Sequence, residues 1–330
     1  MNTGSTRTPR IMTPLKPRIL FFNPVRHALA AYEALSAVAA PEVVASKSRA
    51  ELFADLKDRY GDIRAIYRTS ASGAVAGNFD KELIDHLPPS LKYICHTGRN
   101  ITVTYAPDPV TDATADLTIF LLLGAIRRLN PSLKSLREGK FKQGIDVGHD
   151  PKGKTLGILG MGRIGRAVKH RAAPFGLKVI YHNRKPLSAG LAAGCPYVSF
   201  DDLLKTSDII SIHIPLSAAT HHLIGEAEIV KMKPGVVIVN TARGAIIDEA
   251  AMATGLEDGH IAAVGLDVYE KEPEINERLI KNDRAILVPH LGTHTVETLT
   301  EMESLAMENA RRGVCGEELL TIVPEQLTEG

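Results

Sequence analysis

Short apolar runs alternate with longer mixed segments along most of the chain, and the rhythm is most regular after residue 150. A short apolar run bounded by turn residues predicts a buried strand, and the mixed segments between such runs predict helices. Strands that alternate with helices pair in parallel, because a parallel connection needs a crossover. We therefore expect parallel strands at 154–160, 177–183, 208–214, 235–242, 261–268 and 284–290, with helices at 199–206, 225–232 and 248–259.

The first third of the chain repeats the rhythm more loosely. We expect strands at 18–24, 62–69 and 91–97, helices near 28–38, 48–58 and 79–87, a helix at 111–129 that leads into the second sheet, and a last helix at about 295–312 that returns. This pattern predicts an α/β protein with two Rossmann/flavodoxin-like domains, each a doubly wound parallel sheet. The predicted divisions are a disordered tail at 1–17, one domain from 18–117 plus 296–330, and the other from 118–295.

Composition and charge remove several classes of function. The chain has 39 Lys and Arg against 38 Asp and Glu, a net charge of +1, so we expect no nucleic-acid partner. The longest apolar run, 117–126, is about half of the ~20 residues that a membrane span needs, and Arg127 and Arg128 follow it. Three widely spaced cysteines match neither a disulfide framework nor a metal site. We expect no membrane contact, no metal and a reducing, cytoplasmic location. The N-terminal segment has four cations and no acid, which weakly resembles a transit peptide, although a disordered tail fits its composition better.

A glycine-rich turn lies where the first strand of the second sheet meets its helix. The segment GILGMGRIGRAV places Gly160, Gly162 and Gly165 in a GxGxxG pattern between that strand and that helix. In such a turn the first glycine allows the tight bend, the second lets the backbone approach a pyrophosphate, and the third lets helix and strand pack closely. The free N–H groups of the helix then bind the phosphates. The pattern predicts a dinucleotide site.

The next strand ends without the acid that usually binds a ribose hydroxyl. About 20 residues after the glycines a Rossmann fold commonly has Asp or Glu, whereas this chain has Asn183, Arg184 and Lys185. A guanidinium binds a 2′-phosphate that a carboxylate would repel. We therefore expect NADP(H) as the preferred coenzyme, with NAD(H) possible because Asn183 could hold a bare hydroxyl.

Three charged or titratable side chains follow successive strands of the same sheet. Arg243 follows the fourth strand, Glu272 the fifth and His290 the sixth. Ligands of an open parallel sheet bind beyond the carboxyl ends of its strands, so these residues should meet at one edge. The set suits hydride transfer to a 2-oxo acid: His290 gives a proton to the carbonyl oxygen, Glu272 orients the imidazole, and Arg243 binds the substrate carboxylate and polarised carbonyl.

On these residues the chain resembles the D-isomer-specific 2-hydroxyacid dehydrogenase family. The resemblance rests on LGILGMGRIGRAV, IHIPLSAATHHLI, MKPGVVIVNTARGAIIDEAAM, GLDVYEKEP and ILVPHLGTHT, and YHNRKP is similar to the NADPH-using glyoxylate/hydroxypyruvate reductases. It implies a small 2-oxo or 2-hydroxy acid as substrate, a homodimer, and Arg243, Glu272 and His290 as catalytic residues. It also implies coenzyme contacts at Arg163 and Ile164 near the pyrophosphate, His213, Pro215 and Thr220 near the adenosine, and Thr241, Ala242, Asp267 and Gly292 near the nicotinamide, with Asp267 holding the carboxamide.

One segment departs from the family pattern. In the family a glycine-rich loop that binds the substrate carboxylate follows the strand matching KYICHTG, but here HTG at 96–98 leads almost directly into RNITVTYAPD. Roughly a dozen residues are absent by comparison with ordinary element lengths. This shortened loop near 98–101 leaves two alternatives to an active reductase: a catalytically impaired splice form, or a nucleotide-sensing binding protein like the corepressors that share the fold. Oxidation of formate or phosphite on the same scaffold is a further, weaker alternative.

Overall fold

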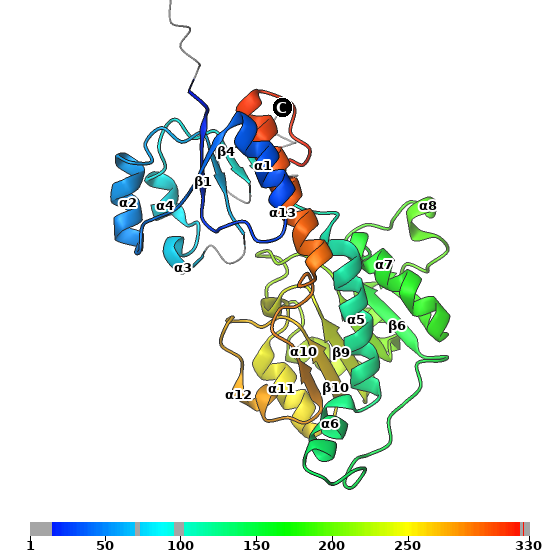
Figure 1. Ribbon diagram of the computed structural model, residues 1–330. Coiled ribbons are helices and arrows are strands. Elements are labelled where there is room, and N and C mark those ends of the chain that lie inside the picture. Colours follow the sequence, from blue (N-terminus) through cyan, green and yellow to red (C-terminus); the bar gives the residue numbers. More distant parts are fainter. Residues whose placement is uncertain (1–14, 70–72, 96–101, 324–325, 327–330) are drawn as a thin grey trace, which may run out of the picture. The chain divides into compact units, whose positions relative to one another are not determined.

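The computed structural model describes residues 15–69, 73–95, 102–323 and 326. The chain forms two compact units, of which the first comprises residues up to Pro107 together with Leu299 onward, and the second comprises Asp108–Thr298 (Figure 1). Two α/β domains with parallel sheets were predicted, and the fold class is confirmed. The boundary lies ahead of the helix predicted at 111–129, rather than at 117–118, because that helix packs along its length against the second unit.

The first unit is a five-stranded parallel sheet with the order β2-β1-β3-β4-β5. This is the flavodoxin-like order, in which β1 and β3 flank the point where the winding reverses. The strands are β1 (Arg18–Phe21), β2 (Ala40–Val43), β3 (Ala65–Tyr67), β4 (Tyr93–Cys95) and β5 (Thr102–Thr104).

Alternate side chains of β1 enter two separate apolar layers of the first unit. Ile19 and Phe21 pack with Leu35 and Met307, whereas Leu20 packs with residues of the opposite layer such as Leu52. Helices on both faces supply these layers: α1 (Leu29–Val38), α2 (Arg49–Lys57), α3 (Gly73–Ala76), α4 (Lys81–Asp85) and the returning α13 (Val296–Cys315).

A carboxylate from α13 caps the start of α1. Glu303 is 9% exposed and accepts hydrogen bonds from the backbone N–H groups of His27 at 2.8 Å and Ala28 at 2.9 Å. Helix α1 has no side-chain cap of its own. Glu303 therefore satisfies N–H groups that a helix start leaves unpaired and joins the two ends of the chain within one unit.

The second unit is a six-stranded parallel sheet with the order β11-β10-β9-β8-β6-β7. The order reverses between β6 and β8, so a ligand crevice is expected beyond their carboxyl ends. The strands are β6 (Thr155–Leu159), β7 (Lys178–His182), β8 (Ile209–Ile212), β9 (Val236–Asn240), β10 (Ile261–Leu266) and β11 (Ala285–Leu287).

Helices cover both faces of this sheet. One apolar layer contains buried residues of α5 (Val110–Ile126) and α7 (Arg163–Ala172), and the other contains those of α9 (Phe200–Thr206), α10 (Glu226–Lys231) and α11 (Glu249–Asp258). The shorter elements are α6 (Leu129–Arg137), α8 (Ala189–Ala192), α12 (Glu277–Ile280), and the 3₁₀ turns η2 (Ala173–Phe175) and η3 (Gly244–Ile246). The apolar run at 117–126 lies within α5, and among the described residues no helix has the length and apolarity of a membrane span.

Several predictions on the first unit need comment. Strand β2 was not predicted, because APEV contains Pro41 and Glu42 and lacks a strand-like pattern. The disordered tail lies outside the described residues except for 15–17, which have no regular structure. The shortened loop near 98–101 also lies outside them. Its flanking strands β4 and β5 are direct parallel neighbours, with Tyr93 opposite Thr102.

Candidate active site

The glycine-rich turn has the geometry that its spacing predicts. Gly160 has a φ of +101°, and a Cβ there would lie 2.7 Å from the carbonyl carbon of His213. A Cβ on Gly165 would lie 2.3 Å from the carbonyl oxygen of Gly160, whereas one on Gly162 would meet nothing within 4 Å. The turn is therefore tight at Gly160, close-packed at Gly165 and open at Gly162, which fits a pyrophosphate approaching the backbone at the start of α7.

Arg163 and Ile164 form the first turn of α7, after the N-cap Gly162. Ile164 packs against the apolar layer between α5 and α7. The Arg163 side chain forms an ion pair with Asp108, with 2.8 Å between Nε and Oδ1, and both side chains are more than half exposed. An exposed pair of this kind contributes little free energy, so a phosphate can compete for this guanidinium.

Asn183 connects the end of β7 to the glycine-rich turn. Its side-chain oxygen accepts a hydrogen bond from the backbone N–H of Met161 at 2.7 Å. The amide nitrogen is then the group that remains for a ligand, and an amide nitrogen only donates. Arg184 and Lys185 follow as exposed residues, and no ion pair to either is formed within the described part of the chain. This corner therefore presents donors and positive charge.

The segment after β8 was predicted to line the adenosine. The imidazole of His213 is bonded through Nε2 to the Ser211 hydroxyl at 2.8 Å, and Nδ1 is buried without a partner among the described residues. Burial lowers the pKa of His213 to about 3, so the ring is neutral at physiological pH. Thr220 bonds the carbonyl of Pro215 at 2.7 Å, which brings these two predicted residues together in one turn.

Glu272 and His290 meet in the fold as the strand-end argument predicts. The His290 Nδ1 lies 2.8 Å from Glu272 Oε2, and Glu272 Oε1 accepts the backbone N–H of Tyr269 at 3.0 Å. Their side chains are 48% and 36% exposed, so solvent or a ligand can reach them. With Nδ1 donating to the carboxylate, Nε2 is the imidazole nitrogen available to hold and transfer a proton.

Asp267 fixes the turn that carries His290. Its carboxylate accepts the backbone N–H groups of Leu291 and Gly292, and its carbonyl accepts that of His290 at 2.9 Å. Burial raises the pKa of Asp267, while the two N–H donors and the nearby imidazole act in the opposite direction. The side chain was predicted to hold the nicotinamide carboxamide. The structure shows that each of its oxygens already binds the turn, so positioning His290 is a second role that the sequence did not reveal.

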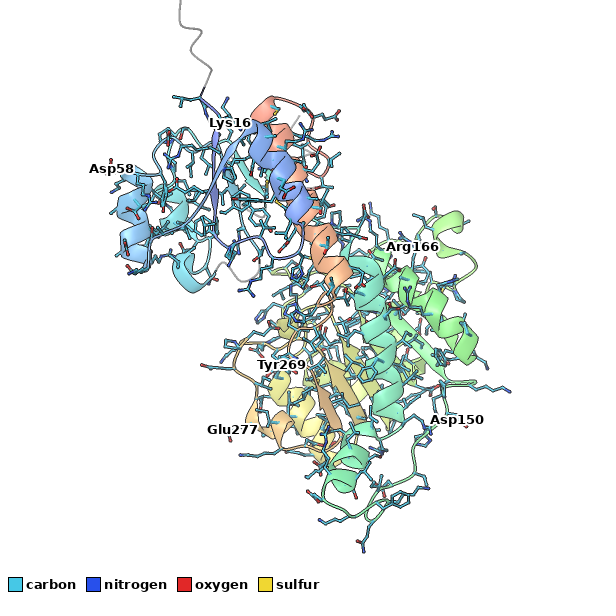
Figure 2. All side chains as sticks on the ribbon, in the orientation of Figure 1. Lys16, Asp58, Asp150, Arg166, Tyr269 and Glu277 are labelled. Atoms are coloured by element: carbon cyan, nitrogen blue, oxygen red, sulfur yellow. The ribbon has the colours of Figure 1, made fainter. Side chains whose placement is uncertain are left out.

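Arg243 lies on a turn that is packed against the segment bearing Glu272. Buried Asn240 donates to the carbonyl of Arg243 at 2.9 Å and accepts from the Ala242 N–H at 3.0 Å. A Cβ on Gly244 would lie 1.9 Å from the carbonyl carbon of Tyr269, which is labelled in Figure 2. The Arg243 side chain is exposed and its Nη1 bonds the carbonyl of Ala242. The residues before and after Arg243 thus hold the segment that bears Arg243 in contact with the segment that bears Glu272.

Two threonines of α5 form hydrogen bonds with residues that were predicted to lie near the nicotinamide. The Thr241 hydroxyl is buried and shares a hydrogen bond of 2.8 Å with Thr118. Thr118 in turn bonds the carbonyl of Thr114, and Thr114 bonds the carbonyl of Gly292 at 3.3 Å. Neither Thr114 nor Thr118 was predicted. Their spacing of one helical turn in DATADLT was the available signal.

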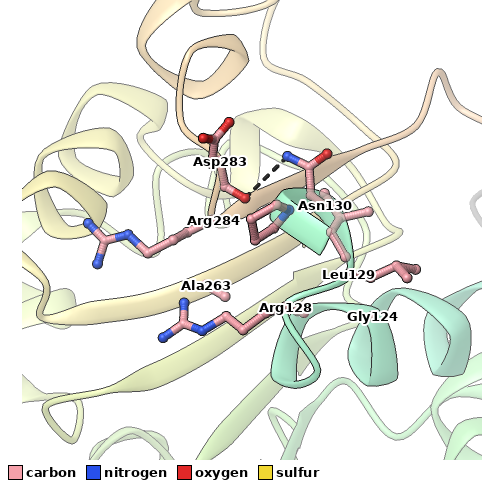
Figure 3. A pocket seen from close by; sticks show the side chains of 10 residues that line it. Gly124, Arg128, Leu129, Asn130, Ala263, Asp283 and Arg284 are labelled. Atoms are coloured by element: carbon pink, nitrogen blue, oxygen red, sulfur yellow. Dashed lines mark hydrogen bonds between the residues drawn. The ribbon is translucent and has the colours of Figure 1, made fainter. Parts of the chain in front are cut away.

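Other features near this sheet have structural roles. The shallow pocket in Figure 3 lies where α6 begins, and Asn130 there donates to the carbonyl of Asp283 at 3.2 Å. It is lined by the end of α5, the start of α6, and residues within β10 and before and within β11, whereas Glu272 and His290 follow these strands. Within the described ranges, no group of three or more His, Cys, Asp or Glu side chains could hold a metal ion.

Comparisons with known proteins agree with this geometry. Residues 119–292, more than half of the chain, match the family model described as D-isomer specific 2-hydroxyacid dehydrogenase, NAD binding domain. The chain is 44% identical over 324 residues to 4-methyl-2-oxopentanoate reductase A of Aspergillus oryzae, and the match covers 94% of this chain and 98% of that protein.

Solved structures show the same likeness over both units. A glyoxylate reductase from Paecilomyes thermophila matches with a TM-score of 0.91 and 47% identity, over 95% of this chain and 100% of that one. An NADPH-dependent glyoxylate/hydroxypyruvate reductase from Sinorhizobium meliloti, solved with NADP and malonate, matches with a TM-score of 0.80 and 28% identity, over 94% and 97% of the two chains.

Proposed function

Because this chain belongs to the D-isomer-specific 2-hydroxyacid dehydrogenase family and reduces 2-oxo acids to 2-hydroxy acids, we propose that its substrates are small 2-oxo acids of the glyoxylate and hydroxypyruvate type, with NADPH as the preferred coenzyme. The observation that carries the catalytic assignment is the 2.8 Å contact between His290 and Glu272 at the ends of adjacent strands. The comparisons give no support to a nucleotide-sensing or catalytically impaired protein.

The three catalytic residues divide the work by their chemistry. A bound reduced coenzyme supplies the hydride to the carbonyl carbon of the substrate. His290 Nε2 gives a proton to the carbonyl oxygen, and Glu272 stabilises the charged imidazole and holds its orientation. Arg243 polarises the carbonyl and interacts with the carboxylate through its guanidinium. In the reverse direction the neutral imidazole accepts the hydroxyl proton.

The preference for NADPH is supported by the corner at the end of β7. Asn183 has its oxygen bonded to Met161, and Arg184 and Lys185 are exposed cations. A 2′-phosphate accepts hydrogen bonds from all three side chains, whereas a ribose hydroxyl lacks the negative charge that the two cations attract. The proposal extends to the remaining coenzyme contacts that were predicted from the sequence.

A homodimer formed through the second unit is part of the proposal. A groove of about 530 Å³ on this unit is lined by the apolar side chains of Leu117, Phe120 and Leu291 and by the acids Asp112, Asp116 and Glu297, and Phe120 is 50% exposed. A second copy would cover this apolar side chain. The Phe120→Asp variant should shift the mass measured by size-exclusion chromatography with light scattering from dimer to monomer, whereas a monomeric wild-type protein would contradict the proposal. We also propose a cytoplasmic location, which is consistent with three free thiols.

The decisive experiment follows the absorbance of NADPH in the presence of glyoxylate, hydroxypyruvate and a branched 2-oxo acid. The wild-type protein should oxidise NADPH with at least the two small acids. His290→Gln should bind NADPH with nearly wild-type affinity and lose most of the turnover, by at least about 10²-fold for loss of a general acid. Wild-type turnover by this variant would rule out the proton-donor role of His290. If the wild-type protein binds NADPH but does not oxidise it with any of the acids, the alternative of a nucleotide-sensing binding protein is favoured.

Coenzyme choice is tested separately at Arg184. Arg184→Ala should weaken the binding of NADPH much more than that of NADH, because only NADPH carries the phosphate. Arg137→Ala removes an exposed arginine at the end of α6 and is the charge-matched control. It should change the affinity for neither NADPH nor NADH. Equal losses for both coenzymes would show that Arg184 does not bind the phosphate.

A further inference from the structure

The loop that carries Glu272 runs from the end of β10 to the start of α12, over residues 267–276. Two hydrogen bonds shape it from within. Glu272 accepts the backbone N–H of Tyr269 at 3.0 Å, and the N–H of Glu274 donates to the carbonyl of Lys271 at 2.9 Å. Because these bonds join residues of the loop to each other, the placement of Glu272 also depends on contacts between the loop and other elements.

A buried carboxylate attaches this loop to α11. Glu249 is the first residue of α11 and is 7% exposed. Its Oε1 accepts a hydrogen bond from the backbone N–H of Glu270 at 2.6 Å, and the backbone N–H of Asn276 also donates to this carboxylate. One donor precedes Glu272 in the loop and the other follows it, so Glu249 holds the loop on both sides of that residue.

Helix α11 is a firm base for this attachment. Met252, Ala253 and Leu256 are at most 2% exposed and pack in an apolar layer of the second unit. A carboxylate in the first turn of a helix also interacts favourably with the positive end of the helix dipole. A group on a packed helix is held more precisely than a group on a loop, so Glu249 is a fixed point for the loop.

The chemistry of position 249 suits two N–H donors. Burial raises the pKa of Glu249, and the nearby carboxylate of Glu270 acts in the same direction, whereas the N–H groups of Glu270 and Asn276 lower it. A carboxylate has acceptor oxygens only, so it can receive both donors, whereas an amide would also present an NH₂ group to them. Position 249 therefore carries a buried acid beside another acid, and the N–H groups of the loop are its hydrogen-bond donors.

We propose that Glu249 is a positioning residue for the reduction, acting on the reacting atoms through Glu272. By fixing the loop on both sides of Glu272, it keeps that carboxylate 2.8 Å from Nδ1 of His290. Misplacement of a catalytic group by about 1 Å lowers a rate on the order of 10²-fold, so a loosened loop should reduce turnover. The inference rests on the proposed function for the roles of Glu272 and His290.

The test compares Glu249→Ala with Asp248→Ala. Asp248 caps the same helix and accepts the backbone N–H groups of Ala250 at 2.9 Å and Ala251 at 3.1 Å, so its replacement removes bonds within α11 rather than bonds to the loop. Glu249→Ala should lower kcat for glyoxylate at least about tenfold and change KM and the affinity for NADPH much less, because Arg243 and the glycine-rich turn follow other strands. Asp248→Ala should keep the wild-type kcat. Glu249→Gln keeps one acceptor oxygen and should recover part of the lost turnover.

A double-mutant cycle separates this role from general destabilisation. In a Glu272→Gln background, Glu249→Ala should lower kcat by less than about twofold, because the group through which Glu249 acts is already altered. A full additional loss in that background, or wild-type kcat in Glu249→Ala, would overturn the inference.

Hydrogen exchange tests the attachment without substrate. Measured by mass spectrometry, the amides of residues 269–276 should exchange faster in Glu249→Ala than in the wild type, and at the wild-type rate in Asp248→Ala. Unchanged exchange in Glu249→Ala would overturn the inference even if the protein reduces 2-oxo acids. A wild-type protein that oxidises NADPH with none of the tested acids would instead refute the proposed function, and the exchange of the loop would still decide whether Glu249 holds it.

Discussion

Replacement of Gly244 by alanine tests whether the activity depends on the contact between the segments that bear Arg243 and Glu272. The new Cβ would lie 1.9 Å from the carbonyl carbon of Tyr269, 2.2 Å from its oxygen and 2.4 Å from the nitrogen of Glu270. Carbon atoms in contact are separated by about 3.5 Å or more, so the segments must move apart by roughly 1.5 Å. Backbone atoms cannot rotate away as the end of a side chain can.

The displacement should reduce both stability and turnover. Overpacking of this kind costs about 1–3 kcal/mol of unfolding free energy, and misplacement of catalytic groups by about 1 Å lowers the rate on the order of 10²-fold. Arg243 lies before Gly244, and Glu272 follows Tyr269, so the change acts on both. The affinity for NADPH should change much less, because the glycine-rich turn follows a different strand.

The assay combines steady-state kinetics with glyoxylate, NADPH binding by fluorescence, and urea unfolding. Gly190→Ala is the matched control, since a Cβ there meets nothing within 4 Å and the residue lies in helix α8. It should retain full activity and gain up to about 1 kcal/mol from helix propensity. Wild-type kcat in Gly244→Ala would refute the reasoning that close packing at this turn positions Arg243 and Glu272.

Two further predictions concern stability. Glu303→Ala should lower the free energy of unfolding by roughly 2–4 kcal/mol, because two N–H groups at the start of α1 lose a charged acceptor. Urea unfolding measures this free energy, and Glu303→Gln should lose less of it because the amide keeps an acceptor oxygen. Burial lowers the pKa of His213 in the folded protein to about 3, from its ordinary value of 6.5. The stability that its neutral ring contributes is therefore present above pH 6.5 and is lost as the pH falls toward 3. The free energy of unfolding of His213→Gln should therefore decline less steeply between pH 6 and 4 than that of the wild type, by up to about 1.4 kcal/mol per pH unit. If urea unfolding gives the same pH dependence of this free energy for both proteins, the reasoning is wrong.

The sequence was sufficient for the parts of the site that follow from strand order. The glycine spacing predicted the turn at Gly160, and the rule that ligands bind at the carboxyl ends of parallel strands predicted that Glu272 and His290 lie close together. Both arguments depend only on local patterns and on parallel pairing, which a periodic sequence specifies well.

The remaining features depend on packing between segments that are distant in sequence. Asn240 was read only as the end of an apolar strand, although its side chain holds the Arg243 turn. Asp267 was predicted only as a coenzyme contact, and the bonds of its oxygens to the His290 turn were not predicted.

The hydrogen bond between Asn183 and Met161 constrains how coenzyme preference can be redesigned. The side chain that we propose meets the 2′-substituent also tethers the glycine-rich turn, so position 183 must keep an acceptor for the Met161 N–H. Aspartate satisfies this and adds the charge that repels a phosphate, which makes it a workable route to an NADH enzyme. Alanine or glycine would loosen the turn and weaken both coenzymes together. Selectivity and affinity are therefore coupled here through one amide group.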